Sequence, residues 1–273
     1  AHSFPTRRSS DLGVGGGFLI VPLLYVLLGI PYEIAIGSSL SFIVGTSAAG
    51  LPKHMWAGNV DRKTVLLLAG GSMVGAVLGD VIQNVLVNSI AGGNTAVFDR
   101  IMTVLFIALL LVTAWLVFQG RRAHHSGRTP LQRLPLGPRV NLTDVGLEGV
   151  SLPGLVVISV GVGVVTGLFG VGGGVLFVPI LLLVVGLDAH KAVGTSLGVV
   201  MLAAIAGTIK KGISHEVNLL IAMCLLIGSS VGVQLGVWLC TQLHAQRLRR
   251  FFAVVVLLAA VLLLVNFFWQ MLG

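Results

Sequence analysis

Charged residues are scarce in this chain: Asp, Glu, Lys and Arg make up 10% of its 273 residues, while hydrophobic residues make up 56%. Soluble domains carry about 25% charged residues, because a hydrated surface has to cover their core. This scarcity excludes an ordinary soluble protein and favours the lipid bilayer as the surroundings. The ten-residue alternation typical of membrane β-strands is also missing. The apolar stretches are continuous instead, so we predict an all-α polytopic membrane protein whose helices need about 20 residues to span the bilayer.

Cysteine is rare, and motifs for metal or cofactor chemistry are missing. The two cysteines, Cys224 and Cys240, lie in apolar runs without a partner motif. The sequence contains no H-E-x-x-H motif, and its glycine-rich blocks do not fit the dinucleotide-binding G-x-G-x-x-G pattern or its strand–helix–strand context. We therefore expect no enzyme, no cofactor and no metal.

The positive charge of the chain, +8 at pH 7, does not indicate nucleic-acid binding. Most Lys and Arg residues lie in short loops between apolar runs, where the positive-inside bias places them. Residues 120–150 form a polar linker rich in Arg and Pro, and we predict that this linker is cytoplasmic.

Residues 1–12, AHSFPTRRSSDL, do not fit the sequence that follows them. A signal peptide needs an apolar central region, and this stretch has none. Read back through the genetic code, residues 2–12 can be encoded by a widely used sequencing-adapter oligonucleotide. We interpret 1–12 as a non-native, adapter-derived segment, and we expect no packed structure for 1–11 and a missing helix before Gly13.

An internal duplication is visible when the sequence is shifted by 157 positions, from Gly13 to Gly170. GVGGGFLIVPLL, which begins at Gly13, then falls on GVGGGVLFVPIL, which begins at Gly170. The G-[ST]-S-L blocks at 37–40 and 194–197 also coincide. We predict a first repeat at 13–119, the linker at 120–150 and a second repeat at 151–273, each with four or five transmembrane helices.

The apolar runs allow two topologies. The runs lie at 16–30, 36–52, 64–90, 100–119, 152–169, 175–187, 191–209, 217–243 and 249–271. If every run crosses, five crossings per complete repeat make the two halves inverted, which is a common plan among transporters. Alternatively, each short pair, 16–30 with 36–52 and 175–187 with 191–209, dips into the membrane and returns.

Short, glycine-interrupted segments at matching places in two repeats are the best sequence indication of a transport site. Runs of this length barely reach across about 30 Å of hydrocarbon, so we expect broken or re-entrant helices at the glycine motifs. Glycines allow sharp turns and a close approach of the backbone to a ligand, and the following helix N-terminus favours an anion. The alternative is that the glycines serve close helix packing. The predicted substrate-binding residues are Gly13, Gly15, Gly16, Gly17, Pro22, Ser38, Ser39, Gly170, Gly172, Gly173, Gly174, Pro179, Thr195 and Ser196.

Three ionisable residues are further candidates. Asp80 lies inside the run 64–90, where a carboxyl group at membrane depth indicates a function such as a proton relay. The alternative places Asp80 at the membrane interface. Lys53 and Lys210 match across the repeats and either steer an anion or extend to the interface from the ends of their runs.

The doubled GxGGGxxxxPxL motif, the A-x-G-[ST]-S-L blocks and the H-x-x-x-G-N-V-D segment at 54–61 resemble the TauE/SafE sulfite exporter family of bacterial permeases. The resemblance covers essentially residues 13–273. It implies about eight helices and a pseudo-symmetric centre formed by the motif glycines and prolines. It also implies export of sulfite, sulfoacetate or a related sulfur-containing anion across the cytoplasmic membrane, with an ion gradient of protons or sodium as the driving force. The second repeat departs from the pattern, because it reads KGISHEVN at 211–218.

We therefore expect a secondary transporter in the bacterial inner membrane that exports a small anion by alternating access around the two glycine motifs. The alternatives are a membrane-embedded enzyme or accessory subunit, or an anion channel. The transporter hypothesis requires both motifs to meet near the middle of the bilayer.

Overall fold

The structure is a computed structural model that describes residues 17–90, 92, 94–119, 139–142, 147–187, 189–242 and 245–272. The predicted adapter segment 1–12 and the predicted site residues Gly13, Gly15 and Gly16 lie outside these residues. The elements are α1 (Gly17–Leu28), α2 (Tyr32–Trp56), α3 (Arg62–Val85), η1 (Leu86–Ile90), α4 (Thr95–Gln119), β1 (Arg139–Leu142), β2 (Leu147–Ser151), α6 (Leu152–Phe169), α7 (Gly174–Ile180), η3 (Leu181–Val185), α8 (Ala189–Ile213), α9 (Leu219–Gln242) and α10 (Ala245–Leu272).

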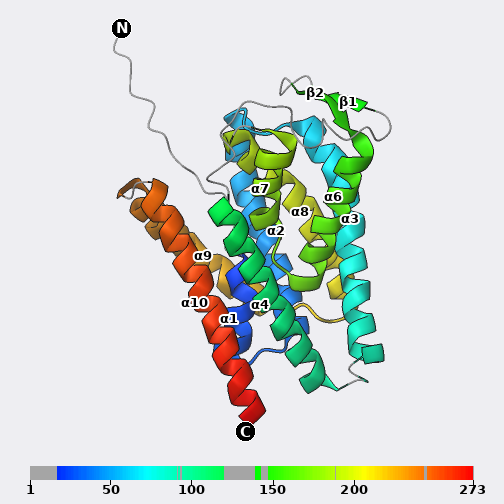
Figure 1. Cartoon of the computed structure of the whole chain (residues 1–273), viewed down its shortest axis with the longest axis vertical. Coiled ribbons are helices and arrows are strands. Elements are labelled where there is room, and N and C mark those ends of the chain that lie inside the picture. Colours follow the sequence, from blue (N-terminus) through cyan, green and yellow to red (C-terminus); the bar gives the residue numbers. More distant parts are fainter. Residues whose placement is uncertain are drawn as a thin grey trace.

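The helices form a bundle of membrane-spanning length (Figure 1). Within the described residues, five helical segments are long and apolar enough to cross a bilayer: Tyr32–Trp56, Arg62–Ser89, Thr95–Thr113, Leu152–Phe169 and His190–Ile213. The strands β1 and β2 pair as an antiparallel hairpin in the linker. The prediction of an all-α polytopic membrane protein is confirmed for the bundle.

Two of the short apolar runs are parts of full-length helices, so our expectation of short segments there is wrong. The run 36–52 belongs to α2 and the run 191–209 belongs to α8, each of which has 25 residues. Polar residues at both ends continue these helices: α2 has Glu33 in its first turn and Lys53 in its last. A count of apolar residues alone misses these polar end turns.

Helices α3 and α6 pack backbone against backbone. A Cβ atom added at Gly75 would lie 2.2 Å from the Val160 carbonyl oxygen, and one added at Gly167 would lie 2.0 Å from the Ala76 carbonyl oxygen. Small residues at every fourth position allow this approach, which is the usual way for helices to associate in a bilayer. Because Gly71 meets Ser159 and the later glycines meet later residues, the two helices run parallel.

Helix α6 ends inside the bundle, and α7 returns toward the end from which α6 came (Figure 1). The last turn of α6 lies beside Gly79, about 15 Å before the end of the span Arg62–Ser89. The chain then passes Ile43, near the middle of α2, and reaches the start of α8 beside Asn59. The re-entrant hairpin is therefore formed by α6 and α7, not by the predicted pair 175–187 and 191–209.

Helices α2 and α8 are antiparallel neighbours with reciprocal contacts. A Cβ atom added at Gly37, near the start of α2, would lie 2.3 Å from the carbonyl oxygen of Glu216, just after α8. A Cβ atom added at Gly194, near the start of α8, would lie 2.3 Å from the carbonyl oxygen of Asn59, just after α2. Adding 157 to the numbers of Gly37 and Asn59 gives Gly194 and Glu216, so the two contacts are equivalent in the two repeats.

An aromatic cluster packs α1, α2, α4 and α6 together. Tyr25 and Tyr32 stack with ring centroids 4.1 Å apart, and Phe106 stacks on Tyr32 and meets Phe169 edge to face. The Tyr32 hydroxyl group is hydrogen bonded to the Thr103 hydroxyl group at 3.0 Å. This cluster places the end of α6, where the second glycine motif begins, against α2.

Candidate functional site

The second glycine motif is a buried break between α6 and α7. Gly170 ends α6 in the left-handed conformation, and its N–H donates to the Thr166 carbonyl oxygen. Gly172 and Gly173 also have positive φ angles, +72° and +63°, which residues with a Cβ rarely adopt. The glycines are thus required by the backbone conformation, as the predicted helix break demands, and Gly174 is the first residue of α7.

The two motifs meet beside Ile43. A Cβ atom added at Gly17, the last glycine of the first motif, would lie 2.9 Å from Ile43 Cδ1 and 3.3 Å from the Val171 carbonyl oxygen. A Cβ atom added at Gly172 would lie 2.7 Å from the same Ile43 Cδ1 atom. Ile43 is one residue from the midpoint of α2, so the meeting point lies halfway along this membrane-spanning helix. The glycines therefore also allow close packing, which was the alternative interpretation.

The predicted hydroxyl groups hold the two repeats to each other. Ser39 Oγ donates to the Gly170 carbonyl oxygen at 2.8 Å and so ties α2 to the second motif. Ser38 Oγ accepts from the Asn218 backbone N–H, whereas Thr195 Oγ1 accepts from the Asp61 backbone N–H. Adding 157 to the numbers of Ser38 and Asp61 gives Thr195 and Asn218, so the two bonds are equivalent in the two repeats. Ser196 Oγ donates within α8, to the Val193 carbonyl oxygen.

The two motif prolines lie inside short helices. Pro22 is in the middle of α1 and Pro179 is in α7, one residue before that helix ends. Proline lacks the backbone N–H that an α-helix needs at this position. The chain after Pro179 continues as the π-helical turn η3, Leu181–Val185, a geometry often found at functional sites.

A cavity of about 270 Å³ lies at the end of the bundle where α2 passes into α3. Gly58, Val60, Asp61, Arg62 and Lys191 line it. The Asp61 carboxyl group caps α3: it accepts from the Lys63 N–H at 3.3 Å and from the Thr64 hydroxyl group. Two basic side chains therefore face this cavity, beside a carboxylate already used as a helix cap. Lys53 is exposed at the same end of the bundle.

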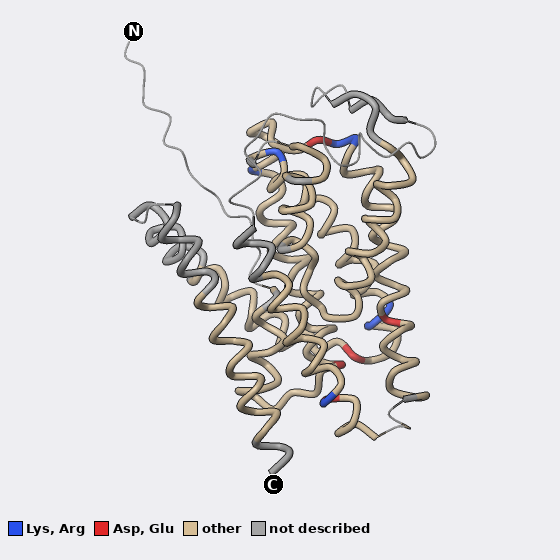
Figure 2. The backbone as a smooth tube through the Cα atoms, in the orientation of Figure 1, with Lys and Arg blue, Asp and Glu red and all other residues tan. Residues whose placement is uncertain are grey.

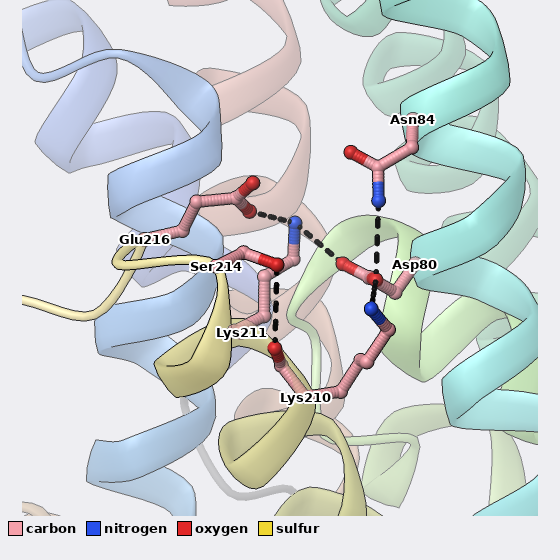
Figure 3. A network of polar contacts seen from close by, with 6 residues as sticks. All are labelled: Asp80, Asn84, Lys210, Lys211, Ser214 and Glu216. Atoms are coloured by element: carbon pink, nitrogen blue, oxygen red, sulfur yellow. Dashed lines mark hydrogen bonds and ion pairs between the residues drawn. The ribbon is translucent and has the colours of Figure 1, made fainter.

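Asp80 is buried in an ion-pair network on the other side of the two motifs (Figure 3). The Lys211 ammonium group lies 2.9 Å from Asp80 Oδ1 and also pairs with Glu216. Lys210 Nζ lies 3.7 Å from Asp80 Oδ2, and the Asn84 amide donates to the same oxygen at 3.3 Å. Asp80 and Lys211 are each only 1% exposed, so both are buried within the protein.

The sequence analysis singled out Asp80 and Lys210 but not the two residues that complete this network. Lys211 matches His54 across the repeats, so it is not a repeated residue as Lys210 and Lys53 are. Glu216 lies in a loop that departs from the family pattern. That departure, KGISHEVN where the first repeat reads HMWAGNVD, was the one signal that could have found both residues.

The described charged residues fall into two zones with an uncharged stretch between them (Figure 2). Residues such as Lys53 and Arg62 belong to the zone at the α2–α3 connection. In the opposite zone, Lys210 and Lys211 are paired with carboxylates and are not free loop charges, and Arg100 is the other described basic residue. The positive-inside bias therefore favours the α2–α3 end as the cytoplasmic one.

Two stretches, at 194–198 and 228–232, fit the hydrolase pattern G-x-S-x-G by their letters. Both lie inside membrane helices, α8 and α9. A nucleophilic serine of this pattern needs a sharp turn between a strand and a helix, so the two stretches lack its structural context.

Comparison with known proteins gives consistent results. The chain is 29% identical to a "Probable membrane transporter protein" of Xylella fastidiosa (strain Temecula1) over 90% of this chain and 85% of that protein. It is 29% identical to the "Probable membrane transporter protein YunE" of Bacillus subtilis (83% and 81% covered) and 25% identical to the "Probable membrane transporter protein MJ0441" of Methanocaldococcus jannaschii (83% and 80% covered). No solved structure matches the chain. Residues 9–263 match the family described as "Sulfite exporter TauE/SafE". The resemblance is thus confirmed, and this multi-pass membrane protein belongs to the TauE/SafE family of membrane transporters.

Proposed function

We propose that this chain is a secondary transporter that exports sulfite, sulfoacetate or a related small sulfur-containing anion across the bacterial cytoplasmic membrane. The proposed substrate site lies where the two glycine motifs meet. Membership of a family described as sulfite exporters supports the substrate class. No enzymatic step is part of this proposal.

The observation that carries the proposal is the contact of Gly17 with Val171 beside Ile43, halfway along α2. Irregular backbone at membrane depth is tolerated only where it is buried in protein or lines a cavity. The buried break of the second motif lies here beside Gly17, the described glycine of the first motif. Substrate sites in transporters built from repeats lie at such contacts between repeats.

The reciprocal contacts of α2 and α8 support an inverted repeat and alternating access. Gly37 with Glu216 and Gly194 with Asn59 are equivalent contacts at opposite ends of the bundle. A two-fold axis between the helices relates them, so an exchange of the two local conformations would move access from one end to the other. In this structure the α2–α3 end carries the basic cavity, and the α8–α9 end carries the ion-pair network.

The basic cavity suits the uptake of an anion from the cytoplasm. Arg62 and Lys191 line it together with Asp61, which leaves one positive charge in excess, and a cleft of positive charge raises the local concentration of anions. Thr195 lies one helical turn after Lys191 in α8, and Ser196 is the next residue. The predicted hydroxyl groups therefore lie one turn farther along α8 than the cavity.

The test is transport of radiolabelled sulfite, thiosulfate and sulfoacetate in vesicles that contain the purified full-length protein. We expect uptake of at least one of them, accelerated by unlabelled anion on the opposite side. A channel would not show this acceleration. The variant Gly173→Leu should abolish transport, because Gly173 has a positive φ and a Cβ there would lie 2.7 Å from Thr166 Oγ1.

The matched control is Gly161→Ala in α6, where an added Cβ meets no atom within 4 Å. This variant should transport normally. Unchanged transport by Gly173→Leu, or no transport of any of these anions by the unaltered protein, would contradict the proposal.

A further inference from the structure

The ion-pair network around Lys211 joins the end of α8 and the loop after it to Asp80, which lies inside the membrane-spanning length of α3. Asp80 is 18 residues after Arg62 in the span Arg62–Ser89, which puts it about 27 Å from one end of that span and about 14 Å from the other. Figure 1 shows the loop that follows α8 above the lower ends of α3 and α4. Charged groups at such a depth are costly, so they mark function.

The charged groups that face this network can be counted among the described residues. Asp80 on α3 and Glu216 in the loop 214–218 are negative, and Lys210 and Lys211 on α8 are positive. These four charges cancel. Glu33 on α2 adds one negative charge.

Glu33 faces the same loop by helix geometry. It lies one turn before Gly37, on the same face of α2, and at Gly37 the helix touches the Glu216 carbonyl oxygen. Glu33 interacts electrostatically with both Glu216 and Lys211.

Asp99 on α4 interacts with Glu33 and adds a further negative charge. Arg100, the next residue, is exposed, and so is His215 in the loop. α6 and the described side chains of α9 contribute no acid or base other than Cys224. The described network therefore holds an excess of negative charge.

We infer that Glu33 and Glu216 together bind one exchangeable proton beside the Lys211–Asp80 ion pair, and that this proton is the coupling ion of the transporter. The inference rests on the proposed function for its coupling role. A proton passes from a hydronium ion to one carboxylate oxygen, which leaves a neutral carboxylic acid and water. This step removes one negative charge from the buried network, where an unpaired charge is costly.

Other observations favour a proton at this place. Glu216 has a side chain that is 17% exposed, so water reaches it, whereas Asp80 and Lys211 are 1% exposed and stay paired. Among the described residues, no group of three or more His, Cys, Asp or Glu side chains is placed to hold a metal ion.

Buried polar atoms next to the network also indicate a place for water or an ion. The Gln83 side chain lies one turn after Asp80 on α3, is 1% exposed, and has no hydrogen-bond partner for its amide oxygen or nitrogen. The Thr208 hydroxyl group, one turn before Lys211 on α8, is also buried without a partner. Polar groups of this kind are normally satisfied by water or an ion.

A short chain of contacts connects this proton site to the glycine motifs. The loop of Glu216 packs on Gly37, and its Asn218 N–H donates to Ser38 Oγ at 3.1 Å. The next residue, Ser39, donates to Gly170 at the start of the second motif. A change in the charge of the loop therefore acts on the helix that holds the motif.

The first test is infrared difference spectroscopy of the purified full-length protein at pH 7. Glu33→Gln and Glu216→Gln each remove one of the two carboxyl groups that share the proton, so each variant should lack one protonated carboxyl group that the unaltered protein shows. The control Ser214→Ala changes the same loop without removing an acid and should keep this group. A signal that persists in both Gln variants, or is missing in the unaltered protein, would overturn the inference.

The second test is anion transport in vesicles with and without a pH difference across the membrane. The pH difference should accelerate transport by the unaltered protein and by Ser214→Ala, but not by Glu33→Gln or Glu216→Gln. An equal acceleration in the two Gln variants would overturn the coupling role. If the unaltered protein moves none of the anions but passes the infrared test, the proposed function fails while the proton site stands.

Discussion

The contact between α3 and α6 predicts that one methyl group at Gly167 destabilises the whole bundle. In Gly167→Ala, the new Cβ would lie 2.0 Å from the Ala76 carbonyl oxygen and within 2.9 Å of two more backbone atoms of Ala76. Real Cβ contacts are essentially never shorter than 3.0 Å, so the two helices have to separate by about 1 Å at this point. Separation also loosens the neighbouring contacts, because Gly163 and Gly75 approach the facing backbones as closely.

The magnitude follows from comparison with Gly161→Ala in the same helix. Both variants gain about 0.5–1 kcal/mol from the higher helix propensity of alanine. Gly161 meets no atom within 4 Å, so the difference between the variants isolates the packing cost at Gly167, about 1–3 kcal/mol. The assay is thermal unfolding of both proteins in the same detergent. Equal unfolding temperatures would refute the backbone-contact argument.

Two double variants sharpen this test. Ala76→Gly should not rescue Gly167→Ala, because the atoms in conflict belong to the Ala76 backbone. At Gly71 the atom in conflict is Ser159 Oγ, 2.0 Å from the added Cβ, and the next nearest atom is 3.1 Å away. Ser159→Ala should therefore rescue Gly71→Ala. Rescue of Gly167→Ala by Ala76→Gly, or no rescue of Gly71→Ala by Ser159→Ala, would contradict this assignment of the conflicting atoms.

Three further predictions concern single contacts. Gly37→Ala and Gly194→Ala should lower the unfolding temperature by similar amounts, because each added Cβ would lie 2.3 Å from a carbonyl oxygen of the opposite repeat; a large effect of only one would contradict their equivalence. Lys211→Met should cost about 3–5 kcal/mol in detergent unfolding, because it leaves two carboxylates without their buried partner, and Lys210→Met should cost less, because Lys210 is 36% exposed. Tyr32→Phe should cost about 1 kcal/mol, because it removes a buried hydrogen bond of 3.0 Å to α4, and an unchanged unfolding temperature would show that this bond is energetically neutral.

Much of the fold follows from local sequence features. The low charge and the continuous apolar runs predict membrane helices because a bilayer leaves no other way to satisfy the backbone. The break at Gly170–Gly173 is predictable because three glycines among these four residues weaken a helix and accept positive φ angles. The re-entrant pairing was not predictable from run lengths, because packing of α6 on α3 decides where α6 ends and α7 turns back.

The candidate site was only partly predictable. The repeat comparison found the motif glycines and the hydroxyl groups, but it did not show that Ser38 and Thr195 hold loops of the opposite repeat. Asp80 was left between a membrane-depth role and an interface position, because its burial depends on Lys211 from a distant helix. Glu216 belongs to no recognised motif, so the sequence alone did not predict it as a site residue.

By itself, the sequence determined that this protein is a bundle of membrane helices with two copies of one glycine motif, because hydropathy and repetition are properties of neighbouring residues. Tertiary structure alone decided that Gly17 meets Val171 at the middle of α2 and that Lys211 lies between Asp80 and Glu216. Such contacts join residues far apart in the chain. They depend on how closely small residues allow helices to approach, and no local pattern records that distance.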